Sequence, residues 1–210
     1  TNIPPHNLRD IAQAAQFVLK NPNVVGEELI EELIKLVKGP DFPTGAQILG
    51  RRGIEDAYRT GRGSITMRAV VNVEELQNRT CLVVTELPYL VGPEKVIEKI
   101  KDGVNNKKLQ GISDVTDLTD RTNGLKLVIE LKTGFDPQVV LDLLYRFTPM
   151  EDSFGINNVA LVDGRPLTLG LRDLLGVYLA HRITVTRRRT NTRLGKRKAR
   201  LHLVEGLLIA

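Results

Sequence analysis

The last forty residues constrain the fold of this chain more than any other feature. Residues 171–210 contain no proline, and their only glycines are Gly176, Gly195 and Gly206. A continuous helix of this length would extend about 60 Å, at 1.5 Å per residue. Its apolar residues gather near the two ends, and its middle is polar and basic. Residues 1–170 could not cover such a helix, so we predict that it projects from a body and needs a partner helix.

The net charge of the chain changes sign near the start of this predicted helix. Residues 181–210 contain nine Lys and Arg residues against Glu205 alone, a net charge of +8. Because the whole chain carries +5, residues 1–180 carry −3. A basic helix on a mildly acidic body is either a solvated helix face or a contact for a polyanion, and composition leaves both readings open.

The composition restricts the class of protein. With 41% hydrophobic and 26% charged residues among 210, the chain is typical of a folded globular protein rather than a disordered or collagen-like one. A single cysteine, Cys81, excludes an internal disulfide and agrees with a cytoplasmic location. The sequence has no run of eighteen apolar residues and no signal-peptide pattern at its start, so we expect no membrane contact.

Hydrophobic periodicity predicts an α+β fold, in which a mixed or antiparallel sheet with flanking helices is followed by the long C-terminal helix. Asn7 is a typical helix N-cap, and Asn123-Gly124 is a hairpin signal. Residues 64–73 alternate as one long strand. The predicted helices cover residues 8–20, 27–37, 53–59, 93–104 and 137–147, and the remaining strands cover 80–87, 112–118, 125–131, 157–162 and 166–169.

The sequence offers little catalytic chemistry. Its three histidines are far apart, and no spacing of ligands indicates a metal site. Cys81 stands among apolar strand residues, which favours a buried structural thiol. Residues 60–64 lack the Lys-Ser/Thr ending of a nucleotide-binding loop, so we interpret them as a tight turn, with contact to a DNA phosphate left open. We interpret the acidic residues of 27–32 and the Glu151-Asp152 pair as solvated surface.

Arginines are the better candidates for a binding site. Five of them occur within eighteen residues, around the predicted turn and strand: Arg51, Arg52, Arg59, Arg62 and Arg68. Aromatic residues are scarce, which argues against binding of single strands by base stacking. Arginines on loops and on one strand face suit the phosphates of a duplex, a contact that is independent of sequence and sensitive to salt.

Several ordered motifs cover almost the whole chain and lie at residues 1–8, 39–44, 53–63, 86–89, 153–157, 187–190 and 198–207. Together they resemble the A subunits of bacterial type IIA DNA topoisomerases. The resemblance favours DNA gyrase over its close relative topoisomerase IV, on residues 153–157 and on Asp163-Gly164.

The resemblance implies a tower domain over residues 1–170 and the first long helix of a coiled-coil arm over residues 171–210. In that family the nucleophilic tyrosine lies upstream of the first motif, so no tyrosine of this chain is expected to be catalytic and the chain alone should be inactive. The family's Mg²⁺ and ATP belong to the B subunit, so no metal ligand or cofactor is expected here. The implied partners are double-stranded DNA, the topoisomerase B subunit, and a second copy of the A subunit.

The resemblance also implies a role in ATP-dependent double-strand passage, the reaction by which the whole enzyme changes DNA topology and supercoiling. This part would bind and brace the gate duplex and link it to the exit gate. The alternative is a stand-alone α/β interaction module whose basic helix docks an acidic protein partner. The residues carried over as DNA contacts are His6, Asn7, Arg51, Arg52, Arg59 and Arg62.

Overall fold

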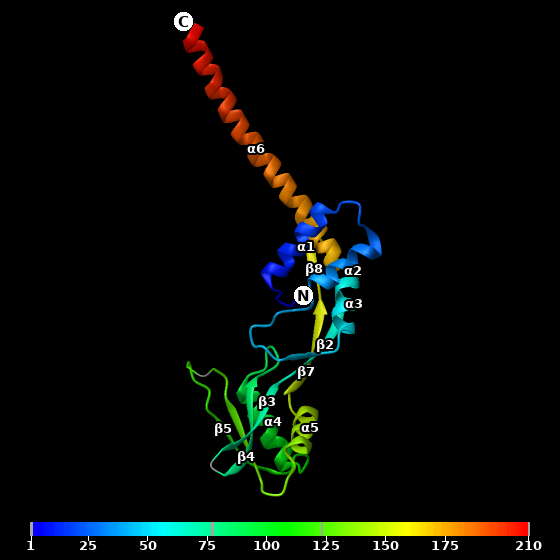
Figure 1. Ribbon diagram of the computed structural model, residues 1–210, viewed down its shortest axis with the longest axis vertical. Helices are drawn as coiled ribbons and strands as arrows, with labels where there is room; N and C mark the ends of the chain where they lie inside the picture. Colours follow the sequence, from blue (N-terminus) through cyan, green and yellow to red (C-terminus); the bar gives the residue numbers. More distant parts are fainter. Residues whose placement is uncertain (1, 77, 123, 210) are drawn as a thin grey trace.

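The computed structural model describes residues 2–76, 78–122 and 124–209. It is an elongated molecule of two lobes, from one of which a single helix projects (Figure 1). We call residues 2–68 and 151–175 the helical lobe and residues 69–150 the sheet lobe. Each lobe has its own hydrophobic core. The sequence also predicts a turn over residues 77–79; its Gln77 lies outside the described residues, as do Asn123 of the hairpin signal and the terminal Ala210.

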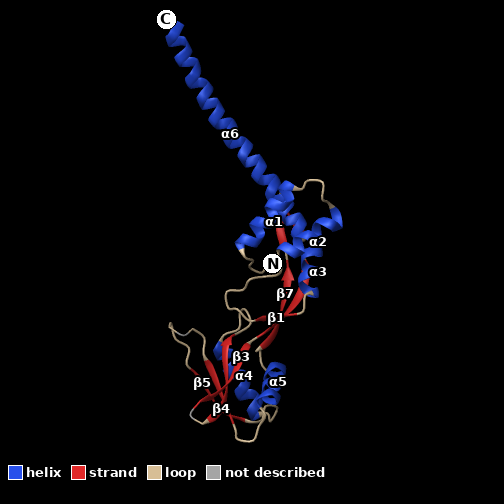
Figure 2. Ribbon diagram, viewed as in Figure 1, coloured by secondary structure: helices blue, strands red, loops and turns tan. Residues whose placement is uncertain are grey.

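The helical lobe joins a small sheet to three helices and lies next to the projecting helix (Figure 2). Its three-stranded antiparallel sheet has the order β1-β2-β7, and a separate hairpin is formed by β8 and β9. The helices are α1 (Leu8–Lys20), α2 (Gly26–Leu36) and α3 (Arg52–Thr60). The strands are β1 (Gln47–Leu49), β2 (Arg62–Arg68), β7 (Glu151–Asn157), β8 (Val159–Val162) and β9 (Arg165–Thr168).

The sheet lobe is a four-stranded antiparallel sheet with the order β3-β4-β6-β5 and two helices. Its core is formed where apolar residues of β4 and β6, such as Leu82 and Ile129, pack with Val96 and Leu144 of the helices. The strands are β3 (Val70–Leu76), β4 (Arg79–Glu86), β5 (Ile112–Asp117) and β6 (Leu127–Leu131), and the helices are α4 (Pro93–Asn105) and α5 (Pro137–Phe147).

The predicted α+β class is confirmed, but the single strand over residues 64–73 is wrong. The chain changes sheets at Ala69, so that β2 pairs with β7 in one lobe and β3 pairs with β4 in the other. Ala69 is buried, and its backbone N–H donates to the carbonyl of Met150 at 2.7 Å. The apolar alternation of β2 continues in the sequence through Val71 and Val73, although Val73 is exposed, so the pattern does not reveal the change of partner.

The interpretation of Glu151 as solvated surface is also wrong. Residues 151–157 form β7, in which Glu151 stands opposite Arg68 of β2 and binds its guanidinium at 2.5 Å. The Glu151 side chain is 29% exposed. The polar stretch from Glu151 to Ser153 has no apolar alternation, so this strand is specified by its distant partner rather than by its own residues.

The long C-terminal helix is confirmed as α6 (Leu171–Ile209). Leu171 and Leu175 are buried in the core of the helical lobe and hold its first turns. Beyond them the helix leaves the body, and most of its described residues are exposed (Figure 1). Within the described ranges no helix is long and apolar enough to cross a membrane. The division into domains at residue 170 stays a prediction.

Amide hydrogen exchange provides a test of the isolated arm. We expect amides from Lys196 to the end of α6 to exchange far faster than those of β4 and β6, because no other described element packs on this end of the helix. Mass spectrometry of peptic fragments would measure both in one sample. Protection of residues 196–209 equal to that of the sheet would contradict this account.

Candidate nucleic-acid interface

Two glycines bring α3 directly against β2. A Cβ on Gly53 would collide with the carbonyl of Ser64, and a Cβ on Gly63 would collide with the carbonyl of Gly53. Gly61 then ends the helix in the left-handed region at φ 79°, with the Leu169 carbonyl 2.6 Å from where its Cβ would lie. The predicted tight turn is confirmed. Backbone contact on both sides makes α3 and β2 a rigid support for the arginines around them.

Three arginines on this support are exposed, namely Arg51, Arg52 and Arg62. Arg51 is the residue before α3, and its Nε lies 3.9 Å from the Glu55 carboxylate, at the limit of an ion pair. Arg52 is the first residue of α3 and Arg62 the first of β2. Among the described residues, no carboxylate pairs with the guanidinium of Arg52 or Arg62. Their charges are therefore available to an external anion.

Arg59 lies in the last turn of α3 and faces α2. Its guanidinium forms ion pairs with the carboxylates of Glu27 and Glu31, and these pairs connect α3 to α2. The acidic run of α2 is exposed as expected, but the sequence did not reveal these ion pairs. With two carboxylates on one guanidinium, Arg59 offers little net positive charge to a ligand.

Arg68, the fifth arginine of the cluster, is held by contacts within the fold. It pairs with Glu151, and its guanidinium carbon lies 4.5 Å from the ring centroid of Tyr145 in α5. Because β2 belongs to the helical lobe and α5 to the sheet lobe, this cation–π contact joins the two lobes. Arg68 therefore serves the junction rather than a binding surface.

His6 is half-buried and is held by two hydrogen bonds. The Pro4 carbonyl can only accept, so Nδ1 donates to it at 2.9 Å, and Nε2 accepts from the Tyr58 hydroxyl at 2.8 Å. Burial lowers the pKa of His6, an effect that the Pro4 carbonyl and Asp41 oppose in part. The ring is therefore the neutral tautomer at pH 7 and fixes the loop onto α3.

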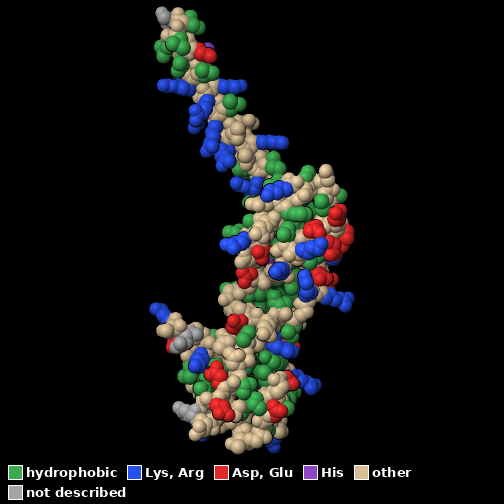
Figure 3. Space-filling view, in the orientation of Figure 1, with side chains coloured by type: hydrophobic (Ala, Val, Ile, Leu, Met, Phe, Trp, Pro, Cys, Tyr) green, Lys and Arg blue, Asp and Glu red, His purple; other side chains and the backbone are tan. Residues whose placement is uncertain are grey.

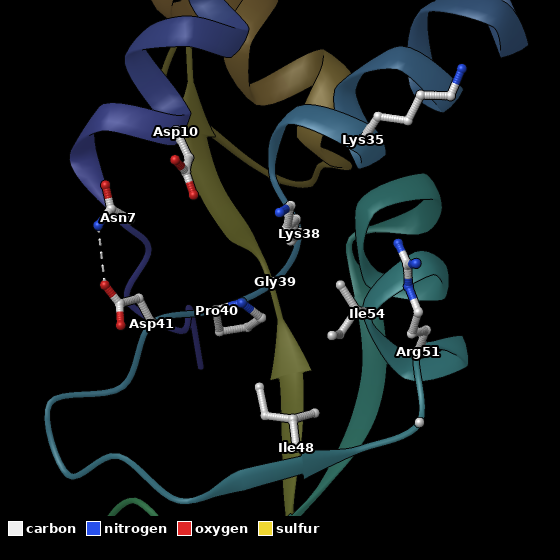
Figure 4. A pocket seen from close by; sticks show the side chains of 11 residues that line it. Asn7, Asp10, Lys35, Lys38, Gly39, Pro40, Asp41, Ile48, Arg51 and Ile54 are labelled. Atoms are coloured by element: carbon white, nitrogen blue, oxygen red, sulfur yellow. Dashed lines mark hydrogen bonds between the residues drawn. The ribbon is translucent and has the colours of Figure 1, made fainter.

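Asn7 is the N-cap of α1, as predicted. Its side-chain oxygen accepts from the Arg9 backbone N–H at 2.9 Å, a bond that typically stabilises a helix by about 1 kcal/mol. Its amide nitrogen donates to the Asp41 carboxylate at 3.4 Å, as the dashed line in Figure 4 marks. The Asn7 amide is thus already engaged on both sides.

Asn7 and Arg51 line one cavity of about 750 Å³, between the start of α1, the end of α2 and the residue before α3 (Figure 4). Two cationic residues that were not predicted from the sequence, Lys35 and Lys38, also line it. The sequence feature that could have predicted them is the position of both lysines near the end of a predicted helix, just before the helix-breaking Gly39-Pro40 pair. Lys35 donates to Glu32 at 2.6 Å, which raises its pKa, and Lys38 is exposed.

The cavity has mixed charge, because the carboxylates of Asp10 and Asp41 face the same space (Figure 4). Of the six predicted contact residues, the structure therefore brings only Asn7 and Arg51 into one cavity. Arg52 begins α3 directly after Arg51, and Arg62 lies beyond the helix on β2. His6 binds Tyr58, and Arg59 binds the carboxylates of α2.

The structure describes no arrangement typical of a catalytic or metal site. Cys81 is buried, as predicted for a structural thiol, and its burial raises the pKa of the thiol. Burial raises the pKa of the Tyr58 hydroxyl well above its usual range, so it is a poor nucleophile. Within the described ranges no three His, Cys, Asp or Glu residues could share a metal ion.

The comparisons with known proteins identify the family. The sequence profile of the A subunit of DNA gyrase/topoisomerase IV matches residues 1–210. The chain belongs to this family. It is similar to the DNA gyrase A subunit of Streptomyces coelicolor, with 54% identity over the whole chain and 24% of that protein. The gyrase A subunits of Nocardioides sp. and Ureaplasma parvum are 49% and 46% identical, again over the whole chain and over 23% and 24% of their lengths. The chain thus spans about a quarter of each of these A subunits.

The half-buried imidazole of His6 makes the stability of the chain depend on pH. Because the pKa of His6 is lowered in the fold, the unfolded chain binds more protons, so stability is complete above about pH 6.5 and decreases as the pH falls below it. We expect acidification from pH 7.5 to 5.5 to lower the Tm of the native chain more than that of His6→Gln. His202→Gln, at an exposed position of α6, is the matched control and should keep the native dependence. Equal dependence for His6→Gln would refute the assignment.

Proposed function

We propose that this chain is a segment of the A subunit of a bacterial type IIA DNA topoisomerase that binds and braces the gate duplex. Membership in the family supports the assignment to the A subunit. The exposed, unpaired guanidinium groups of Arg52 and Arg62 on the rigid α3–β2 support carry the DNA contact. Arginines of this kind suit phosphate oxygens, which fix a duplex without reading its sequence.

The six predicted residues have two roles in this proposal. Arg51, Arg52 and Arg62 contact the phosphates. His6, Asn7 and Arg59 position them, because their own polar atoms bind Tyr58, the start of α1 and α2. Lys38 extends the contact surface at the cavity beside Arg51.

In the whole enzyme, we propose, this segment acts without forming the covalent DNA bond itself. The nucleophilic tyrosine would lie in another part of the A subunit, whereas Mg²⁺ and ATP would be held by the B subunit. The expected partners are duplex DNA, the B subunit, and a second copy of the A subunit, and the expected location is the cytoplasm. The chain would link the gate duplex to the arm through α6, whose first turns are anchored in the same lobe as the arginines.

Salt-dependent binding tests the DNA contact. We expect Arg62→Ala to weaken binding to a random-sequence duplex and to reduce the slope of log K against log salt by about 0.9, the value for one lost phosphate contact. Fluorescence anisotropy at salt concentrations from about 50 to 200 mM would measure both. Arg121→Ala, at an exposed position of the sheet lobe, is the control and should leave the slope unchanged. Equal effects of the two substitutions would contradict a contact at Arg62.

Reconstitution tests the assignment to the cleavage reaction. When this chain is joined to the upstream family segment that carries the nucleophilic tyrosine, we expect a covalent protein–DNA adduct in the presence of Mg²⁺ and the B subunit. The same fusion with that tyrosine replaced by phenylalanine is the control and should form none. A fusion that binds both duplex DNA and the B subunit, yet forms no adduct, would overturn the assignment.

A further inference from the structure

Five of the nine Lys and Arg residues that follow His181 in α6 form an ordered pattern, whereas the other four lie elsewhere around the helix. Basic residues recur after seven, four, three and four residues, which places them on one face of a helix with 3.6 residues per turn. All five are exposed, and Figure 3 shows Lys and Arg side chains following one another along the projecting helix. We call this set the basic stripe: Arg182, Arg189, Arg193, Lys196 and Arg200.

A second face of the same helix is apolar. Ile183, Leu194, Leu201 and Leu208 recur after eleven, seven and seven residues, and each is between 44% and 81% exposed. This spacing is that of a seam that pairs with another helix. At 100° per residue, the centre of the seam lies about a quarter turn from the centre of the basic stripe. Pairing of the seam therefore leaves the stripe in contact with solvent.

The stripe is not balanced by acidic residues on its own helix. Between Asp173 and Glu205 the sequence contains no carboxylate. Like charges four residues apart, such as Arg189 with Arg193 and Lys196 with Arg200, destabilise a helix instead of supporting it. An external polyanion would relieve this repulsion.

We propose that the basic stripe is a second binding surface for duplex DNA, separate from the arginines of the helical lobe. From Arg182 to Arg200 it extends about 27 Å, and a duplex presents one phosphate charge per about 1.7 Å of its axis. A straight row of cations on one helix face matches that continuous density of charge. This contact is independent of the base sequence, and its affinity decreases steeply as the salt concentration rises. It does not depend on the proposed role of Arg62, because it uses different residues.

Charge removal at matched positions tests the stripe. The triple variant R189Q/R193Q/K196Q removes three stripe charges, and R187Q/R188Q/K198Q removes the same residue types from other faces of the helix. Glutamine has nearly the helix propensity of Lys and Arg, so circular dichroism should show equal helix content in both variants. The readout is the salt slope of binding to a duplex of about 30 base pairs by the 210-residue chain.

We expect the stripe variant to reduce this slope by about 2 to 3 and the control variant to reduce it by less than about 1. A single substitution, R193Q, should reduce it by about 1. Equal slopes for the two triple variants would overturn the proposal. So would binding of polyglutamate at the same salt concentration as tightly as duplex DNA, since that result would assign the stripe to an acidic protein. The effect of Arg62→Ala on binding tests only the proposed contact of the helical lobe. The difference in salt slope between the two triple variants tests the basic stripe.

Discussion

The direct contact between α3 and β2 is the constraint on which the proposed DNA surface depends. With no side chain on Gly53 or Gly63, the helix and strand backbones meet, and any Cβ there would force them apart. The arginines that begin α3 and β2 are therefore held at a fixed separation without contacts of their own. A surface that binds phosphates in a defined orientation requires such preorganisation, because flexible side chains on a flexible support would lose the contact energy to entropy.

Ion pairing then divides the arginines of this region by role. Arg59 binds two carboxylates of α2, and Arg68 binds Glu151 and the Tyr145 ring, so both hold elements of the fold together. Arg52 and Arg62 remain exposed on the same support. The helical lobe contains nearly equal numbers of acidic and basic residues and can in this way carry a local anion-binding surface, whereas the larger positive charge of the chain belongs to α6.

Local signals in the sequence predicted most elements of this fold, as well as the cap at Asn7 and the buried thiol of Cys81. They failed where a distant partner decides the structure. The change of sheets at Ala69 depends on its pairing with Met150, and β7 depends on its pairing with β2. The same limit holds for the site. Sequence spacing grouped five arginines, but only the packing of α2 and β7 decides which of them are neutralised.

Photocrosslinking tests the central claim most directly, namely that the α3–β2 support presents the DNA-binding surface. A photoreactive amino acid at Ser64, exposed next to Arg62 and Gly63 on β2, leaves every arginine intact, and the same group at Thr116 in β5 is the comparison. We expect adducts with a bound duplex from position 64 and none from position 116. Equal yields from the two positions, or adducts from position 116 alone, would contradict the account.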